Sequence, residues 1–414
     1  MSRILLHSIV FFPDSVSTAY IMTDLALQLK QLGHNVTVLT TTPHYNVETI
    51  AVKNQQMKKL WGGLLYYNDH EGIPIWHVTI SKKDKRVWKR GIDFIRFHVL
   101  SLVVGFFVMS RQDLVIATSP PLTIGMISWL LALRWKAASV YKVAEVYPDL
   151  AIRQGALRNP ALIMFLKWIE RFVYKHNTRI VTIAEQFKKL LRGRGVPDKK
   201  LILIRDSVDV ELYRPLPRNN SFAREHGLLG TFVVSYAGNI GLVQDWESVF
   251  FAAESLSSYP LQFVIIGDGV RREWLVDQIR LRSLKNVKWI GYQPKERMPE
   301  INASCDIAII PMTRTGALDG LPSKIYTIMA CGKPVIATAD EESDMAWLIR
   351  EAKCGRVVGP DNPLALTKAL EAVYLNCDSL SKEGENGRLF VRAFTKESIA
   401  QKYDNLIRCL VRNG

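Results

Sequence analysis

The sequence predicts an α/β protein built from two doubly wound domains that face a central cleft. Three observations support this prediction. The chain has 414 residues, which is too long for one ordinary hydrophobic core. Strand-like apolar runs alternate with amphipathic helical segments from the N-terminus onward, and the alternation restarts near residue 230. Hydrophobic residues make up 48% of the chain and charged residues 22%, which is typical of a globular protein.

The first half opens with a strand–helix–strand unit at residues 4–12, 18–32 and 36–41. One apolar face of the expected helix is formed by residues at helical spacing, namely Ile21, Leu25, Leu29 and Leu32. The short links within this unit favour a parallel sheet, because the helix returns the chain in the direction of the first strand. Further strands are expected at residues 114–118, 140–145 and 180–183.

The second half repeats this pattern with five strands, expected at residues 232–237, 261–266, 287–290, 306–311 and 334–337. Residues 215–220 (ProLeuProArgAsnAsn) have a linker-like composition. We therefore expect an N-terminal domain over residues 1–210 and a C-terminal domain over residues 211–394. A final helix at about 395–414 is expected to pack back on the first domain. Ligands of such sheets bind at the carboxyl ends of the strands.

Positive charge is concentrated in the first half of the chain. Residues 1–205 contain 29 Lys and Arg against 13 Asp and Glu, although the whole chain carries a net charge of only +15. This asymmetry predicts contact with a polyanionic surface, either anionic lipid or nucleic acid. The five scattered cysteines have no zinc-ligand spacing, which favours a reduced, cytoplasmic protein. The apolar N-terminus continues into a strand–helix pattern, so we interpret it as a first strand rather than a signal peptide.

Six short motifs follow one another in a recognisable order. They lie at residues 119–121 (SerProPro), 145–149 (GluValTyrProAsp), 205–209 (ArgAspSerValAsp), 236–241 (TyrAlaGlyAsnIleGly), 267–269 (GlyAspGly) and 318–340. Together they resemble the retaining glycosyltransferases of family 4, in the bacterial branch that builds O-antigen, capsule and colanic acid. The resemblance covers nearly the whole chain. It implies the GT-B fold, two Rossmann-like domains facing a cleft, with the nucleotide sugar bound by the second domain.

The resemblance also identifies donor-binding positions. The family's two glutamates match Asp319, which would position the donor sugar, and Thr327, which would accept hydrogen bonds from the ribose. The family's Arg and Lys for the diphosphate match Asn239 and Gln244, so both expected positive charges are missing. Backbone N–H groups of two further residues would face the sugar and phosphate, those of Gly320 and Leu321.

Lys324 and Ser323 lie inside the same element and are candidates to hold the diphosphate instead. The alternatives are a solvated surface lysine and a helix-capping serine. Because polar groups replace the usual residues while this Ser–Lys pair is present, we interpret the element as a variant donor site that remains active. Glycines after two strands would allow close backbone approach to the ligand or form ordinary turns, namely Gly238, Gly241, Gly267 and Gly269. A helix after Gly238 would offer its N–H groups to an anion.

Five positions in the first half are expected on the acceptor side. Glu145 ends a strand and is a candidate catalytic base, with a loop carboxylate near Lys142 or Arg153 as the alternative. Three further positions are Ser119, Tyr147 and Asp149. Ser17 in the first strand–helix loop can contact the acceptor or cap the helix.

The resulting hypothesis is a retaining glycosyltransferase that needs no cofactor and no metal. It would move a sugar from a nucleotide diphosphate, expected to be UDP, to a polyprenyl-diphosphate-linked saccharide in cell-surface polysaccharide biosynthesis. The basic segment at residues 82–90, with apolar runs at 99–109 and 129–133, would hold it on the anionic inner face of the cell membrane. Two alternatives stay open, a nucleotide-sugar 2-epimerase on the same fold and a basic nucleic-acid-binding or non-catalytic protein; the first hypothesis includes no nucleic acid partner.

Overall fold

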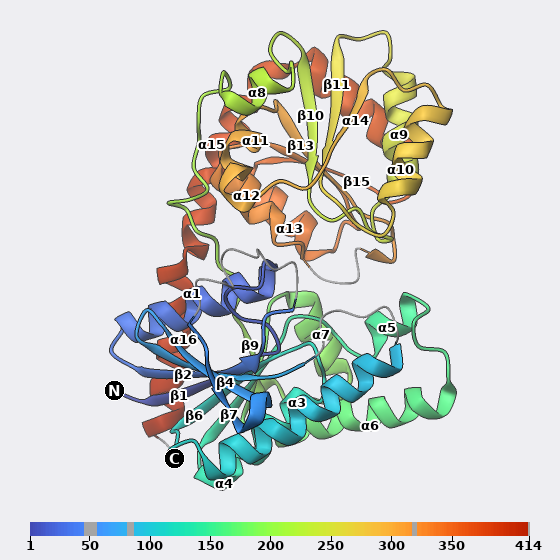
Figure 1. Cartoon of the computed structure of the whole chain (residues 1–414). Helices are drawn as coiled ribbons and strands as arrows, with labels where there is room; N and C mark the ends of the chain where they lie inside the picture. The colour runs from blue at the N-terminus through green and yellow to red at the C-terminus, as the bar shows by residue number, and fades with distance from the viewer. Residues whose placement is uncertain (45–55, 81–86, 317–320, 413–414) are drawn as a thin grey trace. The chain divides into compact units, whose positions relative to one another are not determined.

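The computed structural model describes residues 1–44, 56–80, 87–316 and 321–412, without the side chains of residues 87–90 (Figure 1). The chain divides into two compact units. Unit 1 comprises Met1–Asp206 and Lys396–Gly414, and unit 2 comprises Ser207–Thr395. Each unit contains one largely or wholly parallel sheet with helices on both faces, so the predicted α/β class with two doubly wound domains is confirmed.

The unit 1 sheet has nine strands in the order β3-β4-β5-β2-β1-β6-β7-β8-β9. Their bounds are β1 Arg3–His7, β2 Asn35–Thr41, β3 Lys58–Leu60, β4 Leu65–His70, β5 Ile73–Val78, β6 Leu114–Thr118, β7 Ala138–Val143, β8 Arg179–Thr182 and β9 Leu201–Leu203. Neighbours from β5 to β9 are parallel. The sequence prediction missed β5 and β9 as well as the antiparallel strands β3 and β4. The turn from β4 to β5 places Glu71 and Gly72 at positive φ, which suits a tight hairpin.

Helices cover both faces of this sheet (Figure 1). On one face α1 (Ser17–Gln31) packs against α16 (Lys396–Arg412), and buried His34 bonds Asp404 of α16 at 2.8 Å. The opposite face is covered mainly by α3 (Val87–Phe107), α4 (Ile124–Trp135), α6 (Pro160–His176) and α7 (Glu185–Gly193). α4 contacts both α3 and α6. A short helix, α5 (Asp149–Arg153), follows β7.

The unit 2 sheet has six parallel strands in the order β12-β11-β10-β13-β14-β15. Their bounds are β10 Phe232–Ala237, β11 Leu261–Ile266, β12 Val287–Ile290, β13 Ile307–Pro311, β14 Val335–Thr338 and β15 Gly355–Val358. Alternate strand residues face two separate cores, because side chains alternate along a strand. Val234 and Phe263 contribute to one core, and Val233 and Val264 to the other.

Eight α-helices among the described residues cover the two faces of this sheet. They are α8 Ser221–Glu225, α9 Trp246–Ser255, α10 Arg272–Leu281, α11 Met298–Ala303, α12 Lys324–Ala330, α13 Asp344–Ala352, α14 Pro363–Leu375 and α15 Leu380–Val391. α9 packs beside α14 over one core, and α8 packs beside α11 over the other. The start of α12 lies within the donor element identified in the sequence, so this helix positions the candidate site.

The segment predicted to be a linker, residues 215–220, belongs to unit 2. Arg218 forms an ion pair with Asp306 at 2.5 Å and donates to the Thr231 carbonyl at 2.6 Å. The Asn220 side chain accepts from the Ala223 N–H at 3.0 Å and so caps α8. The linker interpretation was therefore wrong, because polar side chains bind this Pro-rich segment to the unit. The units divide between Asp206 and Ser207.

Candidate active site

Two loops of unit 2 meet at the carboxyl ends of β10 and β11. A Cβ atom on Gly267 would lie 1.9 Å from the carbonyl oxygen of Gly238, and a Cβ on Gly269 would lie 2.2 Å from that of Ile240. Gly267 also has φ of +135°, which favours glycine. Both glycines are thus needed for backbone-to-backbone contact between the loops, and their close approach to a ligand stays a prediction.

The amides of residues 238–241 already have acceptors, with one exception. Gly238 N–H donates to the Ile266 carbonyl at 2.9 Å, and Ile240 N–H donates to the Asp268 carbonyl at 2.8 Å. Gly241 N–H donates to the side-chain oxygen of buried Gln244 at 2.8 Å. Gln244 therefore stabilises its own loop. The prediction that these amides together hold a diphosphate was wrong.

A helix does not begin directly after Gly238, contrary to the prediction. α9 starts at Trp246, and the Asp245 carboxylate caps it by accepting from the Ser248 N–H at 3.1 Å. Within residues 238–241, the Asn239 amide has no acceptor among the described residues. The Asn239 side chain is exposed and lies in the space left open by Gly241 and Gly269. Asn239 is thus a predicted donor-binding residue of this loop whose backbone N–H and exposed side chain remain available.

Lys324 opens α12 and reaches back to the end of β10. Its ammonium nitrogen lies 3.8 Å from the centroid of the Tyr236 ring, a cation–π contact. A Cβ on Gly238 would come within 2.5 Å of this nitrogen, so the ammonium occupies space that only glycine leaves. No carboxylate of the residues described in the structure pairs with it. The alternative of a solvated surface lysine is therefore wrong, and the position of Lys324 beside the donor loop agrees with a binding role.

Burial lowers the pKa of Lys324 to about 7. The Lys324 ammonium has lost much of its hydration and has no paired carboxylate among the described side chains. Binding of an anion therefore stabilises it, since the anion replaces the lost hydration. The tyrosine face partly compensates this loss while leaving the ammonium's N–H groups available. The arrangement therefore favours binding of a phosphate or diphosphate.

Tyr236 is the site residue that sequence reasoning missed. Its hydroxyl donates to the Asn239 carbonyl at 2.6 Å, and its ring packs edge-on against buried Trp246 with centroids 4.9 Å apart. Burial raises the pKa of Tyr236, so its hydroxyl stays protonated. The aromatic residue in the TyrAlaGlyAsn motif was visible in the sequence, but nothing there showed that Lys324 would lie on its ring.

The other residues of the α12 element have mixed outcomes. Ser323 holds the N-cap position in a helical conformation and makes no side-chain cap bond, so the capping alternative is wrong. The Thr327 hydroxyl donates to the Lys324 carbonyl at 2.8 Å, and its oxygen can still accept a further bond. Leu321 is buried. Asp319 and Gly320 lie outside the described residues.

Ser119 and Ser17 in unit 1 differ in their surroundings. Ser119 is fully buried, and its oxygen accepts from the amides of Ala144 and Glu145 at 2.9 and 3.2 Å. Ser119 joins the segments that follow β6 and β7. The prediction that it contacts the sugar acceptor is therefore corrected to a structural role. Ser17 is exposed at the first position of α1, where Val16 is the N-cap residue and no side chain caps the helix. Capping by Ser17 is therefore wrong, and its contact with the acceptor stays a prediction.

The remaining acceptor-side candidates lie close to each other in sequence but have different contacts. The Asp149 carboxylate at the start of α5 pairs with Arg194, which also pairs with Glu170 of α6. Through Arg194, Asp149 therefore connects α5 with α6, which is a structural role and not the predicted acceptor contact. Tyr147 packs partly buried against the unit 1 core. Glu145 follows the end of β7, is partly buried and bonds Ser119 through its backbone; its catalytic role stays a prediction.

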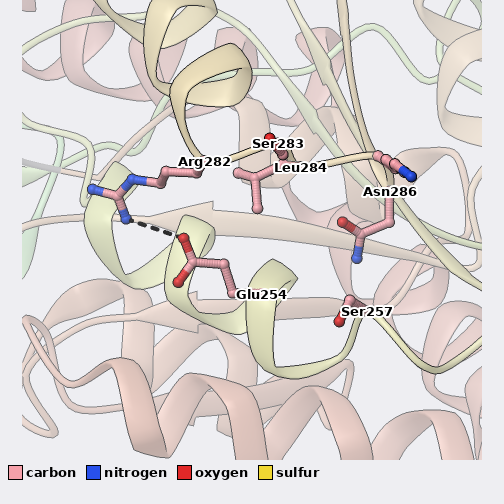
Figure 2. A pocket seen from close by; sticks show the side chains of 7 residues that line it. Glu254, Ser257, Arg282, Ser283, Leu284 and Asn286 are labelled. Atoms are coloured by element: carbon pink, nitrogen blue, oxygen red, sulfur yellow. Dashed lines mark ion pairs between the residues drawn. The ribbon is translucent and has the colours of Figure 1, made fainter.

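A surface pocket of about 390 Å³ in unit 2 lies at the other end of the sheet (Figure 2). Asn286, just before β12, and Ser257, just after α9, line it together with Glu254 and Arg282. Glu254 and Arg282 form an ion pair at 3.7 Å. This pocket is formed by residues near the amino ends of the strands, whereas Lys324 lies over β10's carboxyl end. It is therefore separate from the candidate active site.

The described residues contain neither a candidate metal centre nor a helix that could span a membrane. No three His, Cys, Asp or Glu side chains there are grouped so as to hold a metal ion. None of the described helices is both long and apolar enough to cross a membrane.

Two family models match the chain, one in each unit. The model for the "Glycosyl transferase 4-like domain" matches residues 18–206, and the model for "Glycosyl transferases group 1" matches residues 220–390. Together the two matched ranges span most of the chain.

Curated relatives carry related descriptions. A probable glycosyltransferase, WbjE of Pseudomonas aeruginosa, is 24% identical over 64% of this chain and 66% of its own length, just under two thirds. A putative colanic acid biosynthesis glycosyl transferase, WcaI of Escherichia coli K12, is 23% identical over 98% of this chain and its full length.

Solved structures show the same fold at low sequence identity. HepE of Anabaena in complex with UDP has a TM-score of 0.72 and 13% identity, covering 99% of this chain and 100% of that one. WaaG, a glycosyltransferase involved in lipopolysaccharide biosynthesis, has a TM-score of 0.65 and 14% identity, covering 98% and 99%. The two matched family models and the shared fold therefore establish that the chain belongs to the family 4 glycosyltransferases with the GT-B fold.

Proposed function

We propose that this protein is a retaining glycosyltransferase that uses a UDP-sugar and extends a polyprenyl-diphosphate-linked saccharide during cell-surface polysaccharide biosynthesis. The relatives named for colanic acid and lipopolysaccharide biosynthesis support the pathway class. HepE was solved with UDP and with UDP-glucose, which supports UDP as the donor nucleotide. Because the proposed acceptor is lipid-linked, the protein would work at the cytoplasmic face of the cell membrane.

The observation that carries the proposal is the position of Lys324. Its ammonium lies over Tyr236 at the carboxyl end of β10, where parallel α/β sheets bind their ligands. No carboxylate within the described ranges neutralises it. A nucleotide diphosphate is a polyanion of the kind that such a partly desolvated cation attracts.

In the proposed reaction, the bond between the sugar's anomeric carbon and the β-phosphate oxygen breaks, and UDP departs. The acceptor hydroxyl oxygen attacks the anomeric carbon on the same face, and its proton passes to the departing phosphate oxygen. Lys324 would stabilise the negative charge that develops on the diphosphate, with Ser323 and the Asn239 amide as further donors. Asp319 would position the sugar hydroxyls. No metal or cofactor is part of this proposal.

The direct test is turnover with a panel of UDP-sugars and short-chain polyprenyl-diphosphate saccharides, assayed with EDTA present. UDP release and a mass-detected extended acceptor are expected for one donor, with the anomeric configuration retained. Release of UDP that requires no acceptor would indicate hydrolysis instead. An altered sugar without any acceptor would identify an epimerase, and the proposal would then be wrong.

Thr327 is proposed to accept a hydrogen bond from the ribose. Thr327→Val keeps the side-chain shape but removes the acceptor oxygen, so UDP affinity should fall about fivefold, the value of one net hydrogen bond. Calorimetric titration with UDP measures this loss. With 2′,3′-dideoxyuridine diphosphate, the variant and the unmodified protein should bind equally. The same loss with both nucleotides would show that Thr327 does not contact the ribose.

UDP affinity should also depend on pH through Lys324. With its pKa lowered to about 7 by burial, Lys324 loses its proton as pH rises above that value in the free protein. A bound diphosphate favours the charged form and raises this pKa, so binding must then take up a proton. Affinity should therefore fall by up to about tenfold per pH unit between pH 7 and 9.

Calorimetry in two buffers with different ionisation enthalpies counts the proton that is taken up. In Lys324→Met, the affinity should be weaker and flat over the same range. A pH slope that persists in this variant would assign the proton uptake to another group.

A further inference from the structure

Helix α6 in unit 1 exposes a row of large apolar side chains. Four of them have between 45% and 72% of their surface exposed, namely Leu162, Met164, Phe165 and Trp168. The rings of Phe165 and Trp168 stack with their centroids 6.1 Å apart. The buried side of the same helix, which includes Ile169 and Val173, packs on the unit 1 core. The exposed row is therefore an apolar face additional to the one that folding requires.

Three cations lie along α6 at i, i+4 and i+8 spacing, which places them in one row. They are the exposed side chains of Lys167, Arg171 and Lys175. No described carboxylate forms an ion pair with any of the three. They line a surface groove of about 800 Å³ that is completed by the loop after α7.

The rest of the groove adds positive charge. Arg194 and Lys200 from the loop after α7 also line it, and the carboxylate of buried Glu170 is bonded by Arg194. Lys200 donates to the Lys175 and Asn177 carbonyls, and burial together with neighbouring Arg179 and Lys199 lowers its pKa. The three cations of α6 thus remain available to external anions.

We propose that α6 lies in the surface of an anionic membrane, with its apolar row at the boundary between headgroups and acyl chains and its cationic row on lipid phosphates. Surface-lying helices combine an apolar face, interfacial Trp and Phe, and a basic face in this way. Lys and Arg stems reach past the apolar row to the headgroups. The proposal deepens the proposed function, because it rests on a lipid-linked acceptor and names the element that meets the membrane.

Charge complementarity selects this occupant over two others. A second copy of α6 would bring the same cations together, and like charges oppose that contact. A nucleic acid would satisfy the cations but leave Met164 and Leu162 exposed. The segment predicted from the sequence for this role lies at residues 82–90, of which residues 82–86 and the side chains of 87–90 lie outside the described part of the chain. α6 is therefore a different and fully described surface.

The first test changes only charge. Lys167→Gln, Arg171→Gln and Lys175→Gln are combined in one variant, and a matched control combines Lys285→Gln, Lys368→Gln and Lys382→Gln, three exposed lysines of unit 2. Partitioning onto vesicles of 3:1 phosphatidylcholine and phosphatidylglycerol is measured by sedimentation. The α6 variant should bind roughly 100-fold more weakly, and the control should bind like the unmodified protein. Equal losses in both variants would mean that net charge, not α6, drives binding.

The second test changes only the apolar row. Phe165→Ser with Trp168→Ser should weaken partitioning by roughly tenfold or more, whereas Leu364→Ser with Leu375→Ser on α14 should not. Circular dichroism melting and UDP titration establish that each variant is folded and still binds its nucleotide. Unchanged vesicle binding in the folded α6 variants would overturn the proposal. So would salt-sensitive binding to duplex DNA without vesicle binding, and neither outcome depends on whether sugar transfer is observed.

Discussion

Replacing Lys324 with alanine should lower kcat/KM by about 100-fold or more, on the scale of losing one transition-state contact. The ammonium lies 3.8 Å from the Tyr236 ring centroid, and no carboxylate of a described residue pairs with it. Its removal therefore leaves the developing diphosphate charge without the cation proposed to stabilise it. The loss should fall on kcat as well as on KM, because charge on the departing diphosphate grows in the transition state. UDP release from the preferred donor measures it.

The matched control is Lys368→Ala, which removes an exposed lysine of the same unit and should leave kinetics unchanged. Lys324→Arg keeps the charge, but a planar guanidinium needs different space beside Gly238, so partial activity is expected. The folding of Lys324→Ala should be little affected, because removing a desolvated charge relieves a burial cost. Near-normal turnover in Lys324→Ala would show that the diphosphate is held elsewhere.

Removing the Asp206 carboxylate should have the largest effect on stability. Buried Lys142 of β7 donates to Asp206 at 2.7 Å, and both side chains are nearly inaccessible to solvent. Asp206→Ala leaves Lys142 as an unpaired buried cation, which should cost about 3–5 kcal/mol of unfolding free energy. The melting midpoint of unit 1 should fall by about 10 °C, measured by circular dichroism.

The pH dependence of this pair follows from Lys142. Burial is the largest single influence and lowers the pKa of Lys142, but the charge and hydrogen bond of Asp206 together with Tyr403 outweigh it, so the pKa is raised overall. A raised lysine pKa contributes stability that is complete below the unfolded value and is lost only as pH rises through the folded value. In Asp206→Ala the effect of burial is no longer offset by this carboxylate, so the pKa of Lys142 falls, and the penalty should be largest near pH 6 and shrink towards pH 9 as the folded variant loses this proton.

Two variants serve as controls for this prediction. Asp198→Ala breaks the exposed Arg192–Asp198 pair at 2.6 Å and should leave the midpoint unchanged, since solvent screens such pairs. Lys142→Met combined with Asp206→Leu should recover much of the stability, because no charge is then left buried. A midpoint equally low in the double variant would mean that packing, and not the unpaired charge, causes the loss.

Much of the fold could be predicted from local sequence patterns. Apolar runs of strand length, several of them followed by glycine, located β1, β2, β6, β7, β8 and every strand of unit 2 except β15, because this pattern depends on residues close in the chain. The hairpin of β4 and β5 was missed, although Glu71-Gly72 is a usable turn signal. Residues 215–220 looked like a linker because composition does not show that Arg218 pairs with Asp306, far along the chain.

The sequence by itself determined which family the chain resembles and which loop carries Lys324, since motif order and spacing are local facts. Tertiary structure decided what each group in that loop is free to do. In the folded protein the amides of Gly238, Ile240 and Gly241 donate hydrogen bonds within the loops, and Lys324 lies over the ring of Tyr236. The physical reason is that each donor and acceptor forms only a few hydrogen bonds, and folding pairs many of these groups with partners distant in sequence. Only the groups left over after this allocation can bind a substrate.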